Sequence, residues 1–159
     1  MTRTYARSLK GARAYGARPD PRGESITLIG AMALNGLLAA MTVDGGTNQD
    51  VFQVFIKQIL VPCLWPGATV VMDNLPAHKV KTVQTTLEAA GARVIYLSAY
   101  SPDFNPIENC WSKLKEYLRS MAARTRDSLE QAIANAINLV TPKDIRNWFA
   151  HCCYCTSLN

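Results

Sequence analysis

The sequence has 159 residues, 48% of them hydrophobic, and is long enough for one domain with a buried core. Its net charge of +5 and its pI of about 9.1 point to a polyanionic partner such as a nucleic acid. No apolar run approaches the roughly 18–20 residues of a membrane span, and no apolar segment follows the N-terminal arginines as in a secretory signal. We therefore expect a cytoplasmic protein without a membrane partner.

Residues 1–25 are rich in arginine, glycine and proline without a periodic pattern, so they are predicted to form a basic arm or loop. A polyanion would explain the excess of positive charge there, although a charge run alone is more often a solvated arm. Six cations fall within the first 22 residues, against the single acid Asp20: Arg3, Arg7, Lys10, Arg13, Arg18 and Arg22.

The next segment predicts a β-hairpin followed by a helix. The stretch from Ile26 to Leu34 is a near-continuous apolar run, which is typical of a strand covered on both faces. Asn35-Gly36 is a strong hairpin signal, and Leu37 to Val43 is the returning strand. Asn48 is then expected to cap a helix that ends at Pro62.

A second pair of predicted strands surrounds another helix. Ala68 to Met72 is an apolar strand that ends at Asp73, and Arg93 to Leu97 is a further strand. The helix between them is expected to begin at Pro76 and His78. Sites in open α/β sheets lie beyond the carboxyl ends of the strands, so Asp73 is a candidate functional carboxylate.

A second candidate carboxylate, Glu108, lies at the start of the next predicted helix. Asn105 is a good N-cap and Pro106 suits the first helical position. Glu108 then has two interpretations: part of a capping box with Asn105, or a functional acid facing the same crevice as Asp73. It shares a helical face with Lys115 and Arg119, away from the predicted apolar stripe. That stripe comprises Ile107, Trp111, Leu114, Leu118 and Met121.

The C-terminal part predicts two more helices, one capped near Asp127 and one beginning at Thr141-Pro142. No internal repeat or linker interrupts the chain, so one α/β domain is expected. The five cysteines, without an export signal, are expected to be free thiols.

The residues now described resemble a known family. Asp73-Asn74 with His78-Lys79, the run from Tyr100 to Glu108, and Trp111 to Lys115 look like the catalytic domain of bacterial insertion-sequence transposases of the mariner superfamily. These are DDE enzymes with a ribonuclease-H-like fold, and 34 residues separate the last two acids in this branch, as they do here. The resemblance implies a mixed sheet flanked by helices, with residues 26–159 forming the DDE-type domain.

The same resemblance implies that the chain lacks the family's first strand and first aspartate, which precede the segment matching residues 1–25. That strand would lie between the hairpin and the strand ending at Asp73. We expect residues of the arm around Thr4 to Leu9 to fill its position.

The resemblance further implies metal-dependent DNA cleavage and strand transfer during transposition. Asp73 and Glu108 would be catalytic and would bind Mg²⁺ or Mn²⁺, as two ions in the complete enzyme. The supporting residues would be Asn74, His78 and Asn105. Double-stranded DNA is the implied partner, a homodimer is compatible with it, and a bacterial, nucleoid-associated location follows. The candidates for DNA contacts are Lys79, Lys115, Arg119, Arg18 and Arg22.

Two alternatives remain beside the active transposase. In the first, the chain is a catalytically inactive remnant that only binds DNA or pairs with a full transposase. In the second, it is another nuclease of the same fold. The run from Ser101 to Glu108 disfavours the second of these.

Overall fold

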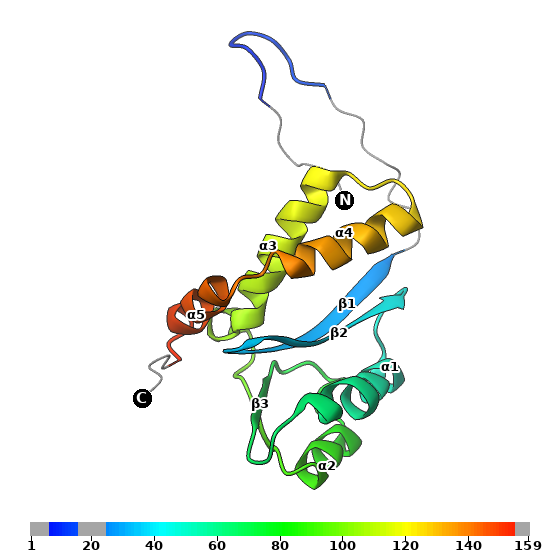
Figure 1. Ribbon diagram of the computed structural model, residues 1–159, viewed down its shortest axis with the longest axis vertical. Coiled ribbons are helices and arrows are strands. Elements are labelled where there is room, and N and C mark those ends of the chain that lie inside the picture. Colours follow the sequence, from blue (N-terminus) through cyan, green and yellow to red (C-terminus); the bar gives the residue numbers. More distant parts are fainter. Residues whose placement is uncertain (1–6, 16–24, 155–159) are drawn as a thin grey trace.

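The computed structural model describes residues 7–15 and 25–154. Residues 7–15 are exposed throughout, with Leu9 86% exposed, and project away from the rest of the protein (Figure 1). The prediction that residues around Thr4 to Leu9 fill a position in the sheet is therefore wrong for Arg7 to Leu9. Thr4 to Ala6 lie outside the described residues, as do Arg18 and Arg22. The physical reason is composition: the described arm is polar, with an isolated leucine, and offers too little apolar surface to bury.

The predicted hairpin is present as β1 (Ile26–Ala33) and β2 (Gly36–Asp44). The strands are antiparallel, with Ile26 opposite Asp44 and Ala33 opposite Gly36. The turn residues are Leu34 and Asn35, one position earlier than predicted. Gly36 instead begins β2 with φ +153, a backbone region that L side chains rarely adopt.

The second pair of strands forms a separate sheet. β3 (Thr69–Met72) and β4 (Arg93–Tyr96) are parallel, with Thr69 opposite Arg93 and Met72 opposite Tyr96. They are connected by α2 (Lys81–Ala89), whose buried Val83 and Leu87 pack in the same core as Met72. Within the described part of the chain, β1 and β3 do not pair, so the strands form two two-stranded sheets rather than one.

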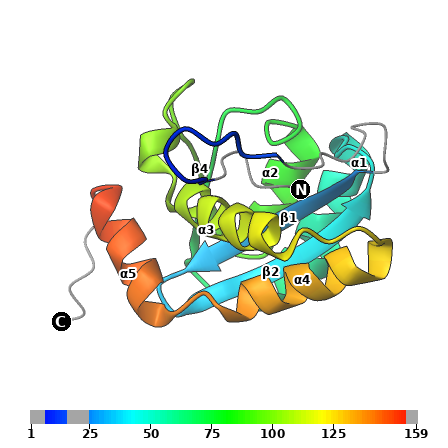
Figure 2. The ribbon, with the colours of Figure 1, turned by 90° about the horizontal axis from the view of Figure 1, so that it is seen from above.

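Helical segments cover the two faces of the hairpin (Figures 1 and 2). Ile29 and Ala31 of β1 pack in the core that holds Phe52 and Phe55, whereas Leu28 and Met32 pack in the core of the other helices. Successive side chains of a strand point to opposite faces. The first face is therefore covered by α1 (Gln49–Val54), η1 (Phe55–Leu60) and η2 (Val61–Cys63), and the second by α3 (Pro106–Met121) and α4 (Arg126–Asn138).

The helix predicted between Asn48 and Pro62 begins as expected, because the Asn48 side chain accepts a hydrogen bond of 2.9 Å from the backbone N–H of Val51. It is not uniformly α-helical: α1 widens into the π-helical η1 and ends in the 3₁₀ turn η2. The apolar residues Phe55, Ile56 and Leu60 of η1 are almost completely buried.

In α3 the predicted apolar stripe is mostly confirmed. Leu114 and Leu118 are buried, and Trp111 packs over Gly30 of β1 in the core, as expected for a structural tryptophan. Met121 is 49% exposed, because the helix ends there beyond the reach of the sheet. Cys110, which the stripe omitted, is completely buried, and burial raises the pKa of its thiol to about 11.

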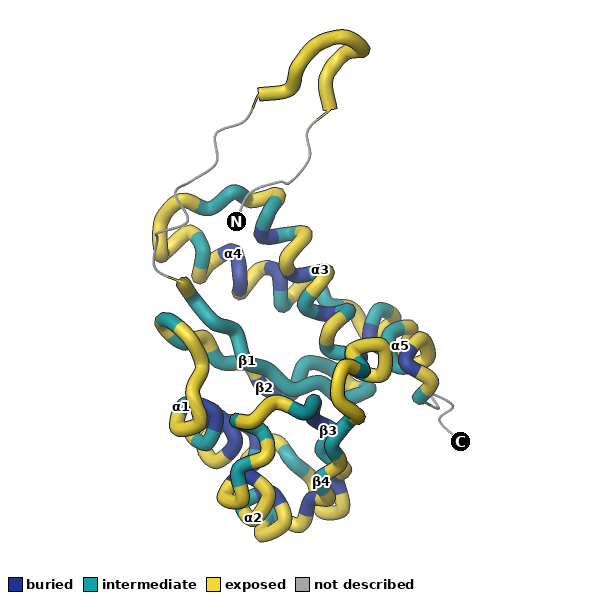
Figure 3. Tube along the Cα trace, turned by 180° about the vertical axis from the view of Figure 1, so that it is seen from behind, coloured by how far each residue is buried: buried dark blue, intermediate teal, exposed yellow. Residues whose placement is uncertain are grey.

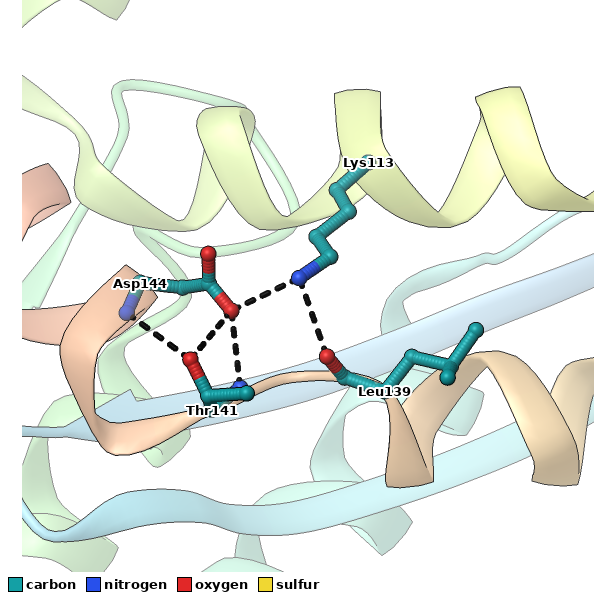
Figure 4. Close-up of polar contacts among 4 residues, drawn as sticks. All are labelled: Lys113, Leu139, Thr141 and Asp144. Carbon is teal, nitrogen blue, oxygen red and sulfur yellow. Dashed lines mark hydrogen bonds and ion pairs between the residues drawn. The ribbon is translucent and has the colours of Figure 1, made fainter.

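The C-terminal helices have capping boxes at their N-termini. The cap of α4 is Thr125, near Asp127 as predicted, and Thr141 caps α5 (Pro142–His151). Lys113 of α3 donates hydrogen bonds to the Asp144 carboxylate at 2.6 Å and to the Leu139 carbonyl at 2.9 Å (Figure 4). This contact connects the last helix to the middle of α3.

We expect a pH-dependent contribution of Asp144 to stability. Hydrogen bonds from Lys113, and then from Thr141, lower the pKa of the Asp144 carboxyl to about 2. Because the pKa is depressed in the folded state, the stabilisation is complete above the unfolded value near 3.9 and is lost as the pH falls toward 2. Asp144→Asn should lower the free energy of unfolding by about 1 kcal/mol at pH 7 and by progressively less from pH 4 to 2.

Urea unfolding at several pH values measures this difference. Asp127→Asn, which changes an exposed acid in the first turn of α4, is the control. A difference between Asp144→Asn and the wild type that stays constant from pH 7 to 2 would contradict the prediction.

Candidate functional site

Asp73 directly follows β3, as the sequence predicted. Its Oδ1 accepts a hydrogen bond of 3.2 Å from the backbone N–H of Leu75 and lies 2.6 Å from Nδ1 of His78. The side chain is 38% exposed, so one side of the carboxylate is held by the protein while part of it remains open to solvent. Such an arrangement orients a carboxylate for contact with a ligand.

His78 is held by three contacts. Its ring lies over that of Phe52, with centroids 4.2 Å apart, its carbonyl accepts a hydrogen bond of 3.0 Å from the Tyr96 hydroxyl, and Nδ1 faces Asp73. The prediction that His78 lies at a helix start is wrong: it is in a turn closed by its own N–H and the Leu75 carbonyl, and α2 begins later. Pro76 lies in this turn instead of starting a helix, and the turn brings His78 back to Asp73 at the end of β3.

Glu108 is in the first turn of α3 and is exposed. Asn105 occupies the N-cap position, as predicted, but its side chain makes no capping hydrogen bond. By contrast, Thr125 and Thr141 form complete capping boxes in α4 and α5. The capping-box interpretation of Glu108 thus has no support from Asn105, and the carboxylate is available for another role.

The two acids come from different elements but border the same space. Asp73 and Glu108 both line a cavity of about 440 Å³ between the two sheets and a second cavity of about 420 Å³ beside it. Asn105 also borders both, and His78 borders the first. The strand end and the helix start therefore converge on one cleft, as the sequence predicted. The roles of these residues as ligands or catalysts stay predictions.

The donor set at this cleft fits a hard divalent cation. Oδ1 of Asn74 is buried and has no hydrogen-bond partner among the residues that the structure describes, although a buried amide oxygen normally has one. Together with the carboxylates of Asp73 and Glu108 it provides oxygen donors of the kind that Mg²⁺ and Mn²⁺ prefer. In residues 7–15 and 25–154 no cluster of three or more His, Cys, Asp or Glu side chains could hold a metal, so the carboxylate contribution there is limited to two.

Cations lie beside the cleft and along α3. Lys79 is exposed and borders the second cavity. Lys115 is exposed and Arg119 is half-buried on the helix that carries Glu108. These three predicted DNA contacts are therefore accessible.

Tyr100 is a residue that our reading of the sequence did not single out. Its ring is fully exposed, and it borders the second cavity together with Asp73 and Glu108. Its φ of +57 is unusual for a residue other than glycine and turns the chain at the rim of the cleft. The sequence feature that could have indicated Tyr100 is the presence of an aromatic residue inside a polar, proline-containing turn.

Comparisons with known proteins identify the family and the fold. A family model described as DDE superfamily endonuclease matches residues 1–130, so the chain belongs to the DDE superfamily of endonucleases. No curated protein matches the sequence. In the described residues no helix is long and apolar enough to cross a membrane.

Three of the solved structures that the chain resembles are complexes of the Mos1 mariner transposase. They are the paired-end complex with the left transposon end (TM-score 0.77, 17% identity), the strand transfer complex (0.75, 17%) and the paired-end complex with Mn (0.73, 18%). The matches cover 94% of this chain and 46–47% of those chains, so this chain spans about half their length. They confirm the predicted ribonuclease-H-like fold, and the family model confirms the predicted DDE superfamily. The bacterial insertion-sequence origin and the missing first strand and aspartate stay predictions.

Proposed function

We propose that the chain is the DNA-cleaving domain of a transposase, acting on phosphodiester bonds with Mg²⁺ or Mn²⁺. The observation that supports this most directly is the convergence of Asp73 and Glu108 on one cleft in a chain of the DDE superfamily. The structural neighbours are transposase complexes whose titles name transposon ends, strand transfer and Mn, which favours DNA as the substrate.

Each residue of the cleft has a definite task in this proposal. Asp73 and Glu108, with the Asn74 side-chain oxygen, would hold the metal ion. Bound there, a divalent ion activates an oxygen nucleophile and stabilises the departing oxygen of a phosphodiester. His78 orients Asp73 through their 2.6 Å contact, and its position on Phe52 keeps it there.

The surrounding residues position the DNA. Lys79 and Lys115 contact phosphates, which fixes the position of the duplex without reading its sequence. The exposed ring of Tyr100 is suited to stack on an unpaired base at the cleavage point, because every base has a face on which an aromatic ring can stack.

A cleavage assay on supercoiled DNA tests the proposal. We expect slow nicking that requires Mn²⁺ and disappears in Asp73→Ala, with little or no strand transfer, because two carboxylates provide few ligands for two ions. Efficient strand transfer by the isolated chain would contradict the expectation that two carboxylates support little or no strand transfer.

The alternative function is that of an inactive DNA-binding remnant. It is favoured by the presence of only two candidate carboxylates in the described residues at the cleft. Nicking that is absent at every Mn²⁺ concentration, or that is equal in Asp73→Ala, would support this alternative over the enzyme.

We further expect weak, salt-dependent binding to duplex DNA, because the net charge is +5 and the accessible cations Lys115 and Arg119 lie along α3. Each neutralised phosphate contributes about −0.9 to the slope of log K against log salt. The double variant Lys115→Ala/Arg119→Ala should therefore reduce the slope by about 1.8 if both side chains contact phosphates. Fluorescence anisotropy in a salt titration measures the slope.

Lys143→Ala is the matched control, since Lys143 is exposed but lies on α5. Equal slopes for the α3 double variant and the wild type would exclude α3 from the DNA interface.

A further inference from the structure

The start of α3, which carries Glu108, is weakly held by its own segment of the chain. Asn105 occupies the N-cap position, but its side chain makes no capping hydrogen bond, whereas α4 and α5 begin with complete capping boxes. The chain reaches Asn105 through η3 (Pro102–Phe104), a single 3₁₀ turn, and nearly all residues from 98 to 104 are exposed (exposed residues are yellow in Figure 3). The direction in which the chain enters α3 therefore depends on contacts from other elements, because neither a side-chain cap nor burial of the preceding loop fixes it.

Two such contacts come from the residues that follow α5. The Tyr154 hydroxyl donates a hydrogen bond of 3.0 Å to the carbonyl of Phe104, the residue directly before the N-cap. The Asn109 side-chain amide donates to Sγ of the buried Cys152 at 3.8 Å. One contact thus precedes Glu108 in the sequence and the other directly follows it. Because a thiol sulfur is a weak acceptor, the contact of Tyr154 is the stronger of the two.

The Tyr154 ring is held in place by α5. Cys153 has φ +65, in the left-handed region, and turns the chain back after the helix. The Tyr154 N–H then donates a hydrogen bond of 2.9 Å to the Phe149 carbonyl, and the two rings pack edge to face with centroids 5.6 Å apart. Burial raises the pKa of the Tyr154 hydroxyl, so that group stays protonated and remains a donor. A donor held in a fixed position therefore faces the loop that leads into α3.

The same aromatic pair borders the cleft that contains the two candidate ligands. Phe149 and Tyr154 line the first cavity together with Asp73 and Glu108. Asp73 is held by His78 and by the local backbone, whereas Glu108 depends on the helix start that Tyr154 contacts. The matching family model ends at residue 130, so both aromatic residues lie beyond the part of the chain that the family model covers.

We propose that Tyr154 is a positioning residue of the cleft, which holds the start of α3 and thereby places Glu108 to bind a divalent cation together with Asp73. This inference rests on the proposed function, because it gives Tyr154 a role toward the ion that Asp73 and Glu108 would bind. Loss of the hydroxyl leaves the Phe104 carbonyl without this partner and lets the first turn of α3 change its orientation. The ion would then bind more weakly, since ligands that are not held in place lose more conformational entropy on binding.

Tyr154→Phe tests the proposal, because it removes only the hydroxyl and keeps the ring against Phe149. Amide hydrogen exchange without metal should accelerate at least about threefold at Asn105 and Glu108, whose N–H groups donate to the carbonyls of Pro102 and Asn105. Isothermal titration calorimetry should show a Mn²⁺ affinity that is lower by about 3- to 10-fold. In the nicking assay, the Mn²⁺ concentration for the half-maximal rate should rise by the same factor, while the rate at saturating Mn²⁺ changes less than about twofold.

Tyr117→Phe is the matched control, since it removes a hydroxyl from a half-buried residue further along α3. We expect this control to change the hydrogen exchange and the Mn²⁺ affinity by less than about twofold. Circular dichroism compares the thermal midpoints of both variants with that of the wild type. A loss of folded protein alone would lower the nicking rate at every Mn²⁺ concentration, so the split between metal affinity and saturated rate separates positioning from a purely structural role.

The possible failures can be told apart. Unchanged exchange at Asn105 and Glu108 in Tyr154→Phe would show that the hydroxyl does not hold the start of α3, and would overturn the proposal. Faster exchange with an unchanged Mn²⁺ affinity would overturn it too, because Tyr154 would then be a structural residue only. A wild type that binds Mn²⁺ no better than Tyr154→Phe refutes this inference alone, whereas a wild type that neither binds Mn²⁺ nor nicks DNA refutes the proposed function and this inference with it.

Discussion

Glu108→Gln should weaken Mn²⁺ binding by about 10- to 100-fold while leaving the thermal midpoint of unfolding nearly unchanged. The affinity falls because an amide replaces one of the two carboxylates of the cleft. The fold is preserved because the Glu108 side chain is exposed and lies at a helix start whose N-cap makes no side-chain hydrogen bond. Isothermal titration calorimetry with Mn²⁺ measures the change in affinity.

The matched control is Glu116→Gln, which removes the same charge from an exposed position further along α3. We expect it to lower the Mn²⁺ affinity by less than about twofold, since exposed charges beyond a Debye length of about 10 Å are largely screened. If the two variants lose affinity equally, the effect comes from the overall charge of the helix and Glu108 is not a ligand.

Phe55→Ala should lower the free energy of unfolding by about 3–5 kcal/mol. The Phe55 ring is 2% exposed, lies 6.2 Å from the Phe52 ring centroid and belongs to the core that joins the hairpin to the second sheet. A loss of this size is a large part of the 5–15 kcal/mol typical of a domain. Urea unfolding followed by circular dichroism measures it.

Val54→Ala provides the comparison, because Val54 is the preceding residue and is 43% exposed. Its cost should stay below about 1 kcal/mol. A small effect of Phe55→Ala, similar to that of Val54→Ala, would mean that the core around η1 does not contribute to stability as its burial indicates.

The elements that the sequence predicted well are those with local signals. The four strands begin and end within one residue of their predicted positions, because apolar runs mark them, and the helix carrying Glu108 begins at Pro106 after Asn105, as predicted. The π-helical turn of η1 was not predicted, since its apolar pattern also fits an ordinary α-helix. The separation of β1 from β3 depends on which strands pair with each other, and strand pairing is not determined by the local sequence pattern.

In the candidate site, too, the features with local sequence signals were predicted and those that depend on distant residues were not. Asp73 and Glu108 could be placed at a strand end and a helix start from local patterns, and their convergence followed from the rule for α/β sheets and from the resemblance. The contact of His78 with Phe52 and the pairing of Lys113 with Asp144 join residues more than 25 positions apart. Spacing along one element contains no information about such pairs.

The close approach of β1 and α3 also has a consequence for variation among relatives. A Cβ atom at Gly30 would lie 2.8 Å from the Trp111 ring, closer than real Cβ contacts occur. Position 30 can therefore acquire a side chain only when position 111 becomes smaller. In an alignment of relatives with this fold, we expect these two columns to covary, with glycine accompanying tryptophan and alanine or serine accompanying a smaller apolar residue.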